Sequence, residues 1–149
     1  MTASRVAARH HFLVPAPVAR VFALFDPIAE KDWVDGWDPL PVHPQELSLE
    51  AGSVFFLDRD GRREVWTVLR HDPVAYVAEY LATTPDYQQR WITVRCTTEA
   101  DGTRVDVEYR ITGLSKEGRR EMESFDASHI RHWEAPVAKA LGLGVAGHA

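Results

Sequence analysis

YQQRWITVRCTTEADGTRVDVEYRIT, residues 87–112, decides the fold class because it holds two strand patterns joined by a tight turn. Apolar side chains alternate with polar or charged ones over residues 103–112, and this period of two is typical of a strand with one packed and one solvated face. Asp101-Gly102 suits the positive φ angles of a hairpin turn. We therefore predict an antiparallel pair of strands over residues 87–97 and 103–112.

Strand patterns continue toward the N-terminus of this pair. The dipeptide Asp60-Gly61 and the tripeptide His71-Asp72-Pro73 separate further apolar runs as turns. Residues 36–44 contain three prolines and are predicted to be an extended loop. The pattern as a whole predicts a meander, with additional strands at residues 45–50, 53–58, 63–70 and 74–81.

The N-terminal part of the chain combines one strand with two short helices. Residues 6–14 end in an apolar run that Pro15 stops, which predicts the first strand. Pro17 suits the first position of a helix, and apolar residues then recur at helical spacing as far as Phe25. A second short helix is predicted over residues 27–34.

The C-terminal part predicts one long amphipathic helix. Ser115 is the expected N-cap, and apolar side chains recur at three- and four-residue spacing from Met122 to Leu141. Pro136 is expected to kink this helix, because proline lacks a backbone donor. The tail, residues 142–149, is expected to be frayed.

These elements predict an α+β fold for one domain, residues 1–149. The expected architecture is a curved antiparallel sheet of six to seven strands wrapped around the long C-terminal helix, with two short helices after the first strand. Such an arrangement usually leaves a cavity between sheet and helix. A small-molecule partner is therefore expected.

Composition excludes several classes of partner. The chain has 149 residues and a formal net charge of −5, and its 17 basic residues are scattered, so no nucleic-acid partner is predicted. The N-terminus has no apolar run long enough for a signal peptide or a membrane span, which favours a cytoplasmic protein. The only cysteine, Cys96, lies in a strand pattern and is expected to be a buried, inert thiol.

The sequence resembles the START-like (SRPBCC) superfamily, and within it the polyketide cyclase/dehydrase-like branch. The resemblance rests on VPAPVARVFALF at residues 14–25, on the tryptophan-bearing loop DWVDGWDP at residues 32–39, on the meander and on the closing helix. It covers nearly the whole chain and implies a helix-grip fold that holds an apolar ligand. Members of the superfamily range from lipid and sterol carriers to quinone-binding proteins, aromatase/cyclases and metal-containing hydroxylase subunits.

The predicted pocket consists of aromatic side chains and one histidine. His129 falls between Phe125 and Trp133 on the inward face of the expected helix, where an imidazole can hydrogen-bond a ligand. The faces of Trp66 and Trp91 stay open, because both parities of their strands carry apolar residues. Ordinary core packing is the alternative for all the aromatic residues. The predicted lining residues are Trp37, Phe56, Trp66, Tyr80, Trp91, Tyr109, Phe125, His129 and Trp133.

No metal or other cofactor is predicted. His129 and His132 have a spacing that places two ligands on one side of a helix, but the sequence supplies no third ligand. The superfamily's oxygenase subunits are poor matches, because this chain lacks both their length and their cysteines. Alternation places most charged strand residues outside, whereas an inward Arg90 would indicate an acidic or carbonyl-bearing ligand.

Two functional hypotheses follow. The first is a protein that binds a small apolar ligand, aromatic, polyketide-like or lipid-like, in the cavity. The alternative is a cyclase, aromatase or dehydratase that acts on such a ligand by acid/base chemistry, with His129 or Tyr109 moving a proton. A third interpretation, a regulatory partner of another protein, requires an exposed apolar patch. Formation of a homodimer stays open.

Overall fold

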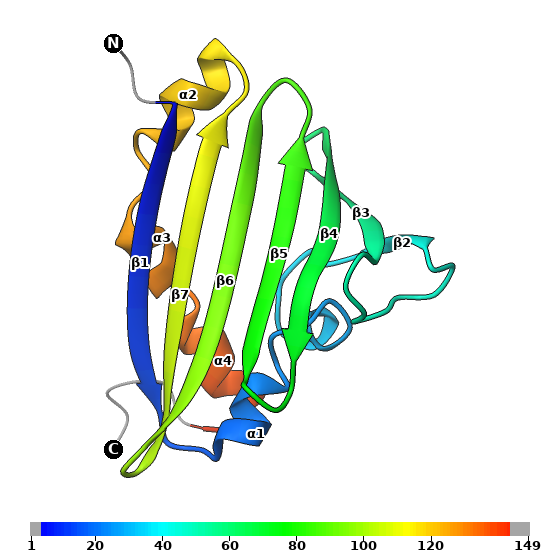
Figure 1. Ribbon diagram of the computed structural model, residues 1–149. Coiled ribbons are helices and arrows are strands. Elements are labelled where there is room, and N and C mark those ends of the chain that lie inside the picture. Colours follow the sequence, from blue (N-terminus) through cyan, green and yellow to red (C-terminus); the bar gives the residue numbers. More distant parts are fainter. Residues whose placement is uncertain (1–3, 144–149) are drawn as a thin grey trace.

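The computed structural model describes residues 4–143, in which seven strands form one antiparallel sheet (Figure 1). The spatial order is β1-β7-β6-β5-β4-β3-β2, so the chain builds the sheet as a meander from β2 to β7 and places β1 beside β7. The predicted fold class is thereby confirmed. The strands are β1 (Arg5–Val14), β2 (Leu40–His43), β3 (Val54–Arg59), β4 (Arg62–Asp72), β5 (Val77–Thr84), β6 (Gln88–Glu99) and β7 (Gly102–Gly113).

Short helices cover one face of this sheet, here called the inner face. Two of them follow β1, as predicted: α1 (Val18–Phe22) and the 3-10 helix η1 (Ala29–Asp32). Three more follow β7 and run along the inner face behind β1, β7 and β6 (Figure 1). They are α2 (Lys116–Met122), α3 (Ala127–Arg131) and α4 (Glu134–Ala140).

The C-terminal segment is helical as predicted, but the prediction that it forms one continuous helix was wrong, because it is divided into α2, α3 and α4. Ser115 caps α2 as expected, since its side chain accepts a hydrogen bond from the Gly118 N–H. The chain then breaks, and Asp126 caps α3 in a reciprocal capping box with His129. Pro136 does not kink a helix. It lies in the first turn of α4, where a missing N–H leaves no backbone acceptor unpaired.

The first predicted meander strand was also misplaced. Residues 45–50 are irregular, and β2 instead occupies residues 40–43, inside the segment predicted to be a loop. Strand β2 pairs only with β3, with Leu40 opposite Phe56, and is therefore an edge strand. An edge strand tolerates Pro41 because it has a neighbouring strand on one side only, so the missing backbone N–H of proline does not interrupt a second row of hydrogen bonds.

Alternation along the strands separates a packed inner face from a half-exposed outer face. On β6, Ile92 and Val94 are buried toward the helices and lie opposite Tyr109 and Val107 of β7. Cys96 belongs to the same buried row, as predicted, and burial raises the pKa of its thiol to about 12. The largest fully buried side chains of the core include Phe25, Phe55, Leu57, Ile111, Met122 and Ile130.

Residues 144–149, most of the tail predicted to be frayed, lie outside the described part of the chain. Within residues 4–143, no helix is long and apolar enough to cross a membrane.

Gly118 lets α2 approach the sheet closely. A Cβ atom at this position would overlap the carbonyl oxygen of Tyr87, at the start of β6. Alanine is otherwise the better helix former by about 1 kcal/mol. We expect Gly118→Ala nevertheless to lower the free energy of unfolding by about 2 kcal/mol, because a backbone clash cannot relax as a side chain does. Urea denaturation would measure this change, with the exposed Lys116→Ala as the control; an unchanged or increased stability of G118A would contradict the close approach.

Candidate functional site

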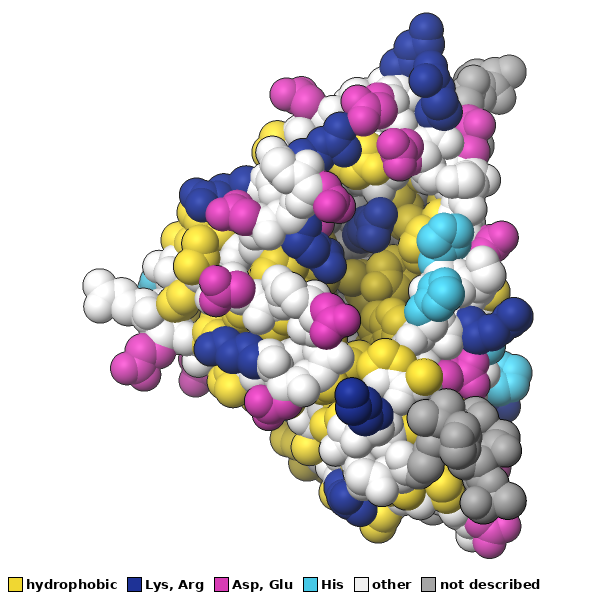
Figure 2. Space-filling view, turned by 180° about the vertical axis from the view of Figure 1, so that it is seen from behind, with side chains coloured by type: hydrophobic (Ala, Val, Ile, Leu, Met, Phe, Trp, Pro, Cys, Tyr) yellow, Lys and Arg dark blue, Asp and Glu magenta, His cyan; other side chains and the backbone are white. Residues whose placement is uncertain are grey.

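A cavity of about 240 Å3 lies between the inner face of the sheet, the loop around η1 and the start of α4. Figure 2 shows it as a hollow with hydrophobic side chains at its floor, Lys and Arg side chains along one side and His side chains along another. Seven of its lining residues are aromatic: Phe25, Trp33, Trp37, Trp66, Tyr80, Tyr109 and Trp133. The others are Glu30, Val34, Asp35, Arg59, Ile92, Val94, His132 and Pro136.

The aromatic side chains are held in place by hydrogen bonds at their polar ends. The indole N–H of Trp33 donates to the Leu24 carbonyl, and that of Trp37 donates to the Pro27 carbonyl, each at 2.8 Å. The Tyr80 hydroxyl donates to the Phe25 carbonyl, also at 2.8 Å. Because these polar groups are bonded to the protein, the rings present their apolar surfaces to the cavity.

The loop that closes the cavity is organised by a buried carboxylate. The Asp26 side chain accepts hydrogen bonds from the backbone N–H groups of Ile28 and Ala29, at 2.8 and 2.7 Å, and so starts the turn that becomes η1. This turn places Glu30 in the cavity wall and Trp33 one turn later.

Glu30 is the carboxyl group of the cavity that has the most unusual surroundings. Within residues 4–143 its side chain has no hydrogen-bond partner, and desolvation raises its pKa well above the ordinary value of 4.5. The Asp26 carboxylate raises the pKa further, whereas Arg59 lowers it. A carboxyl group of this kind favours its protonated form more than an ordinary carboxyl does, and it can exchange its proton with a bound molecule.

Tyr109 provides a second polar group in the cavity. Burial raises the pKa of its hydroxyl to about 12, with Arg90 acting in the opposite direction, so the group is a neutral phenol near neutral pH. In the described part of the chain this hydroxyl forms no hydrogen bond to another side chain, whereas that of Tyr80 is already bonded to Phe25. Tyr109 is therefore the phenol that is free to donate a hydrogen bond to a ligand.

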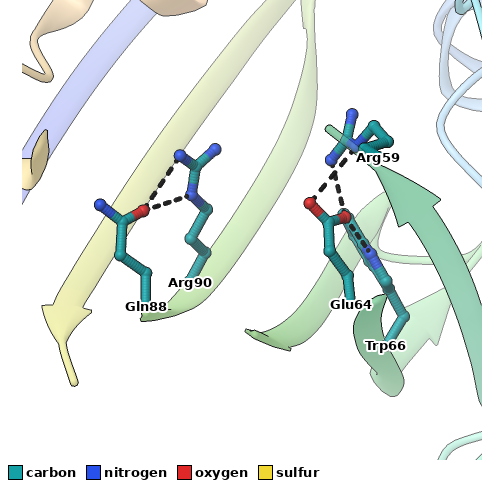
Figure 3. Close-up of polar contacts among 5 residues, drawn as sticks. All are labelled: Arg59, Glu64, Trp66, Gln88 and Arg90. Atoms are coloured by element: carbon teal, nitrogen blue, oxygen red, sulfur yellow. Dashed lines mark hydrogen bonds and ion pairs between the residues drawn. The ribbon is translucent and has the colours of Figure 1, made fainter. Parts of the chain in front are cut away.

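Two arginines lie at the end of the inner face nearest α2, where Gln88, the partner of Arg90, also bonds the Gly118 carbonyl of α2. Figure 3 shows Arg59 and Arg90 with their polar partners. Arg59 donates two hydrogen bonds to Glu64, at 3.3 and 2.9 Å, and Glu64 also accepts the indole N–H of Trp66 at 2.9 Å. Arg90 donates to the side-chain oxygen of Gln88 at 3.2 and 3.1 Å. The inner face thus carries one guanidinium group that is paired with a carboxylate, that of Arg59, and one that is bonded only to a neutral amide oxygen, that of Arg90.

The fold can be compared with known proteins. No protein-family model matches the sequence, and neither does any curated protein. Among solved structures, protein MLL2253 from Mesorhizobium loti is similar with a TM-score of 0.68 and 14% identity, over 92% of this chain and 97% of that one. Norcoclaurine synthase from Thalictrum flavum, in complex with dopamine and hydroxybenzaldehyde, is similar with a TM-score of 0.69 and 8% identity, over 94% and 87% of the two chains.

A third similar structure is DynU16, a protein of the dynemicin biosynthetic locus, with a TM-score of 0.64 and 19% identity over 93% of this chain and 48% of that one. The chain has the helix-grip fold of these structures. This confirms the architecture that the sequence resemblance implied, and at these identities the likeness concerns the fold alone.

The helix-grip fold brings together five of the nine residues that were predicted to line the cavity: Trp37, Trp66, Tyr80, Tyr109 and Trp133. Phe125 and His129 lie beside the cavity and do not line it. The Phe125 ring packs 5.0 Å from that of Tyr109, and the His129 ring stacks on Phe125 at 4.7 Å. His129 is exposed, and its ring accepts the Asp126 backbone N–H in the capping box.

Phe56 and Trp91 do not line the cavity, so the prediction for these two residues was wrong. Both lie on the outer face, where guanidinium groups cover their rings: that of Arg63 lies 4.5 Å from the Phe56 ring, and that of Arg110 lies 4.2 Å from the Trp91 ring. The Trp91 indole also donates to Glu79 at 3.1 Å. Strand parity decides both cases, since Phe55 and Ile92 occupy the inner positions next to them.

Sequence reasoning missed several polar residues of the site. Glu30 carries no local signal, because it is one charged residue in a short helix near the surface. Arg59 follows the apolar run of its strand and resembles a turn residue. His132 lines the cavity, but within residues 4–143 no group of three His, Cys, Asp or Glu side chains is arranged to hold a metal ion.

The raised pKa of Glu30 has a consequence for stability. As pH rises above 4.5, Glu30 loses its proton in the unfolded chain before it does so in the folded protein. The folded state then binds more protons than the unfolded state, so the free energy of unfolding falls as pH rises. Glu30→Gln removes this titration, and we expect the variant to gain stability relative to the parent between pH 4.5 and neutral pH. Urea denaturation at both pH values measures the difference, with the exposed Glu123→Gln as the control. A difference between E30Q and the parent that does not change with pH would contradict the desolvation of Glu30.

Proposed function

We propose that the protein binds a small aromatic molecule of one or two rings in this cavity. The observation that carries the proposal is the wall itself, in which seven aromatic side chains and the unpaired Glu30 carboxyl surround one hollow. Ligand sites are typically concave and mostly apolar, with a few polar groups that orient the ligand.

The size of the cavity favours a compact ligand. Its volume of about 240 Å3 is slightly below the range of about 300–1,000 Å3 that is typical of ligand pockets. A long lipid chain or a sterol would need more space, whereas planar rings can stack between indole faces. The bound dopamine and hydroxybenzaldehyde of norcoclaurine synthase, which shares the fold, support a ligand of this size.

Native mass spectrometry of gently purified protein would test whether such a ligand is bound. A released compound with one or two aromatic rings, at one equivalent per chain, would support the proposal. Release of a fatty acid or sterol instead would contradict it. A protein that carries no added mass and shows no affinity for any member of a panel of aromatic compounds would also contradict it.

Two tryptophans provide a matched pair of variants for binding. Trp133 lines the cavity and stacks on Phe25 with the ring centres 5.8 Å apart, whereas Trp91 lies on the outer face. We expect Trp133→Ala to weaken ligand binding about tenfold, because it removes much of one apolar wall. Trp91→Ala should leave the affinity unchanged. Titration calorimetry measures both, and Trp133→Phe keeps an aromatic wall in case the alanine variant is unstable; equal effects at the two positions would place the ligand elsewhere.

A second candidate function is acid/base catalysis on the bound molecule, and Glu30 is the observation that favours it. In its carboxylate form Glu30 can remove a proton from carbon next to a ketone, which breaks the C–H bond and forms an O–H bond on Glu30, and the raised pKa makes this carboxylate a stronger base than an ordinary one. The Tyr109 hydroxyl can donate a hydrogen bond to the enolate oxygen that results.

This second candidate can be tested without a known substrate. We expect the protein to accelerate exchange of deuterium from solvent into the carbon next to the carbonyl of 2-tetralone, a two-ring aromatic ketone, as followed by NMR. Glu30→Gln should lower the exchange rate about a hundredfold, since a positioned general base contributes about that much. The affinity for 2-tetralone should be preserved in E30Q; an exchange rate that is the same in E30Q and the parent would exclude Glu30 as the base.

A further inference from the structure

The charges around Tyr109 are not balanced, and the imbalance bears on which ligand the cavity selects. Arg59 is compensated, because its guanidinium forms an ion pair at 2.9 Å with Glu64, whose side chain is only 18% exposed. The Glu64 carboxylate has a further role, since it accepts the Trp66 indole N–H. The Arg59–Glu64 pair therefore contributes little net charge to this end of the site.

Arg90 has no such compensation. Its hydrogen-bond acceptor is the neutral side-chain oxygen of Gln88, which takes N–H groups from Nε and Nη2. Gln88 is itself buried and fixed, because its Nε2 donates to the Gly118 carbonyl of α2 at 2.9 Å. Among residues 4–143, no carboxylate lies within ion-pair distance of the Arg90 guanidinium.

Arg90 does not line the cavity but lies next to its wall, two residues from the lining residue Ile92 on the same face of β6. The guanidinium carbon lies 5.6 Å from the centre of the Phe125 ring, and this ring packs 5.0 Å from that of Tyr109. Arg90 is near enough to lower the pKa of the hydroxyl of Tyr109, a residue that lines the cavity. The N–H groups of Arg90 that Gln88 does not use, on Nη1 and Nη2, are donors suited to a planar anion.

The carboxyl groups near the cavity do not cancel this charge. Desolvation favours the neutral form of Glu30. Asp26 is occupied by two backbone N–H groups. Asp35 is exposed, so solvent screens it. The site thus combines one partly buried, uncompensated cation with the neutral hydroxyl donor of Tyr109.

We propose that the aromatic ligand carries a carboxylate or a comparable planar anionic group, which binds between the Arg90 guanidinium and the Tyr109 hydroxyl. The inference rests on the proposed function, because it specifies the ligand of the same cavity. The aromatic body of the ligand lies among the tryptophans, and its anionic group restores charge balance at the end nearest α2. A planar carboxylate can accept two parallel N–H groups from a guanidinium, and this pairing fixes its orientation. A lysine ammonium group would not orient the carboxylate in this way.

The test compares three ligands that share one ring system. Titration calorimetry at neutral pH would measure the affinities of 2-naphthoate, 2-naphthamide and 2-naphthylmethylammonium, which are anionic, neutral and cationic. We expect the anion to bind about tenfold more tightly than the amide, since a charge-assisted pair exceeds a neutral hydrogen bond by about that factor. The cation should bind most weakly.

Arginine variants assign the preference to a residue. Arg90→Gln should abolish the preference for 2-naphthoate and leave the affinity for 2-naphthamide within about twofold, whereas Arg90→Lys should retain part of the preference. The control is Arg95→Gln, an exposed arginine on the outer face of the same strand, which should change nothing. If R90Q fails to fold, R90K still tests the proposal, because loss of planar donors should reduce the preference while the charge remains.

The outcomes separate this inference from the proposed function. Equal binding of the anion and the amide, or tighter binding of the cation, would overturn the anionic ligand and leave aromatic binding intact. A preference for the anion that persists in R90Q would overturn the role of Arg90. Absence of binding by all three compounds would overturn both proposals.

Discussion

The antiparallel pairing of β6 with β7 determines which side chains the helices cover. In this register Ile92 lies opposite Tyr109 and Val94 opposite Val107, and all four project toward the inner face. A shift of β6 by one residue would turn Trp91 and the exposed Arg95 inward and bury a charge in the core. The aromatic wall of the cavity, the outward position of Trp91 and the inward position of Arg90 therefore all depend on this one register.

The cavity exists because the segments that cover the inner face are interrupted. Asp26 turns the chain after α1, so η1 crosses the inner face without filling it. Asp126 restarts the helix after α2, and His132 and Trp133 form a turn between α3 and α4. Each break replaces part of a continuous apolar helix face by a turn, and the aromatic rings span the remaining space. The hydrogen bond from Tyr80 to the Phe25 carbonyl then ties the sheet to the covering segment.

The electrostatics of the site follow from this packing. Glu30 is desolvated because η1 places it in the wall of the cavity, and Tyr109 is desolvated because rings surround it. Desolvation favours the neutral form of both groups, while Arg59 forms an ion pair with a carboxylate on the neighbouring strand and Arg90 does not. The result is an apolar hollow with one acid, one phenol and one uncompensated cation. Such a combination is suited to orienting a small polar aromatic molecule, and it costs stability that a fully apolar core would not.

Sequence by itself predicted a curved antiparallel sheet of six to seven strands, the two short helices after the first strand and the inward position of Tyr109, because local periodicity encodes which face of a strand or helix is apolar. Sequence did not reveal the faces of Phe56 and Trp91, since apolar residues occupy both parities of their strands. It also did not reveal that Asp126 restarts the helix. Glu30, Arg59 and Arg90 acquire their properties only from neighbours distant in the chain. Only the tertiary structure decided the polar groups of the site, because desolvation and charge pairing depend on positions in space that local sequence patterns do not specify.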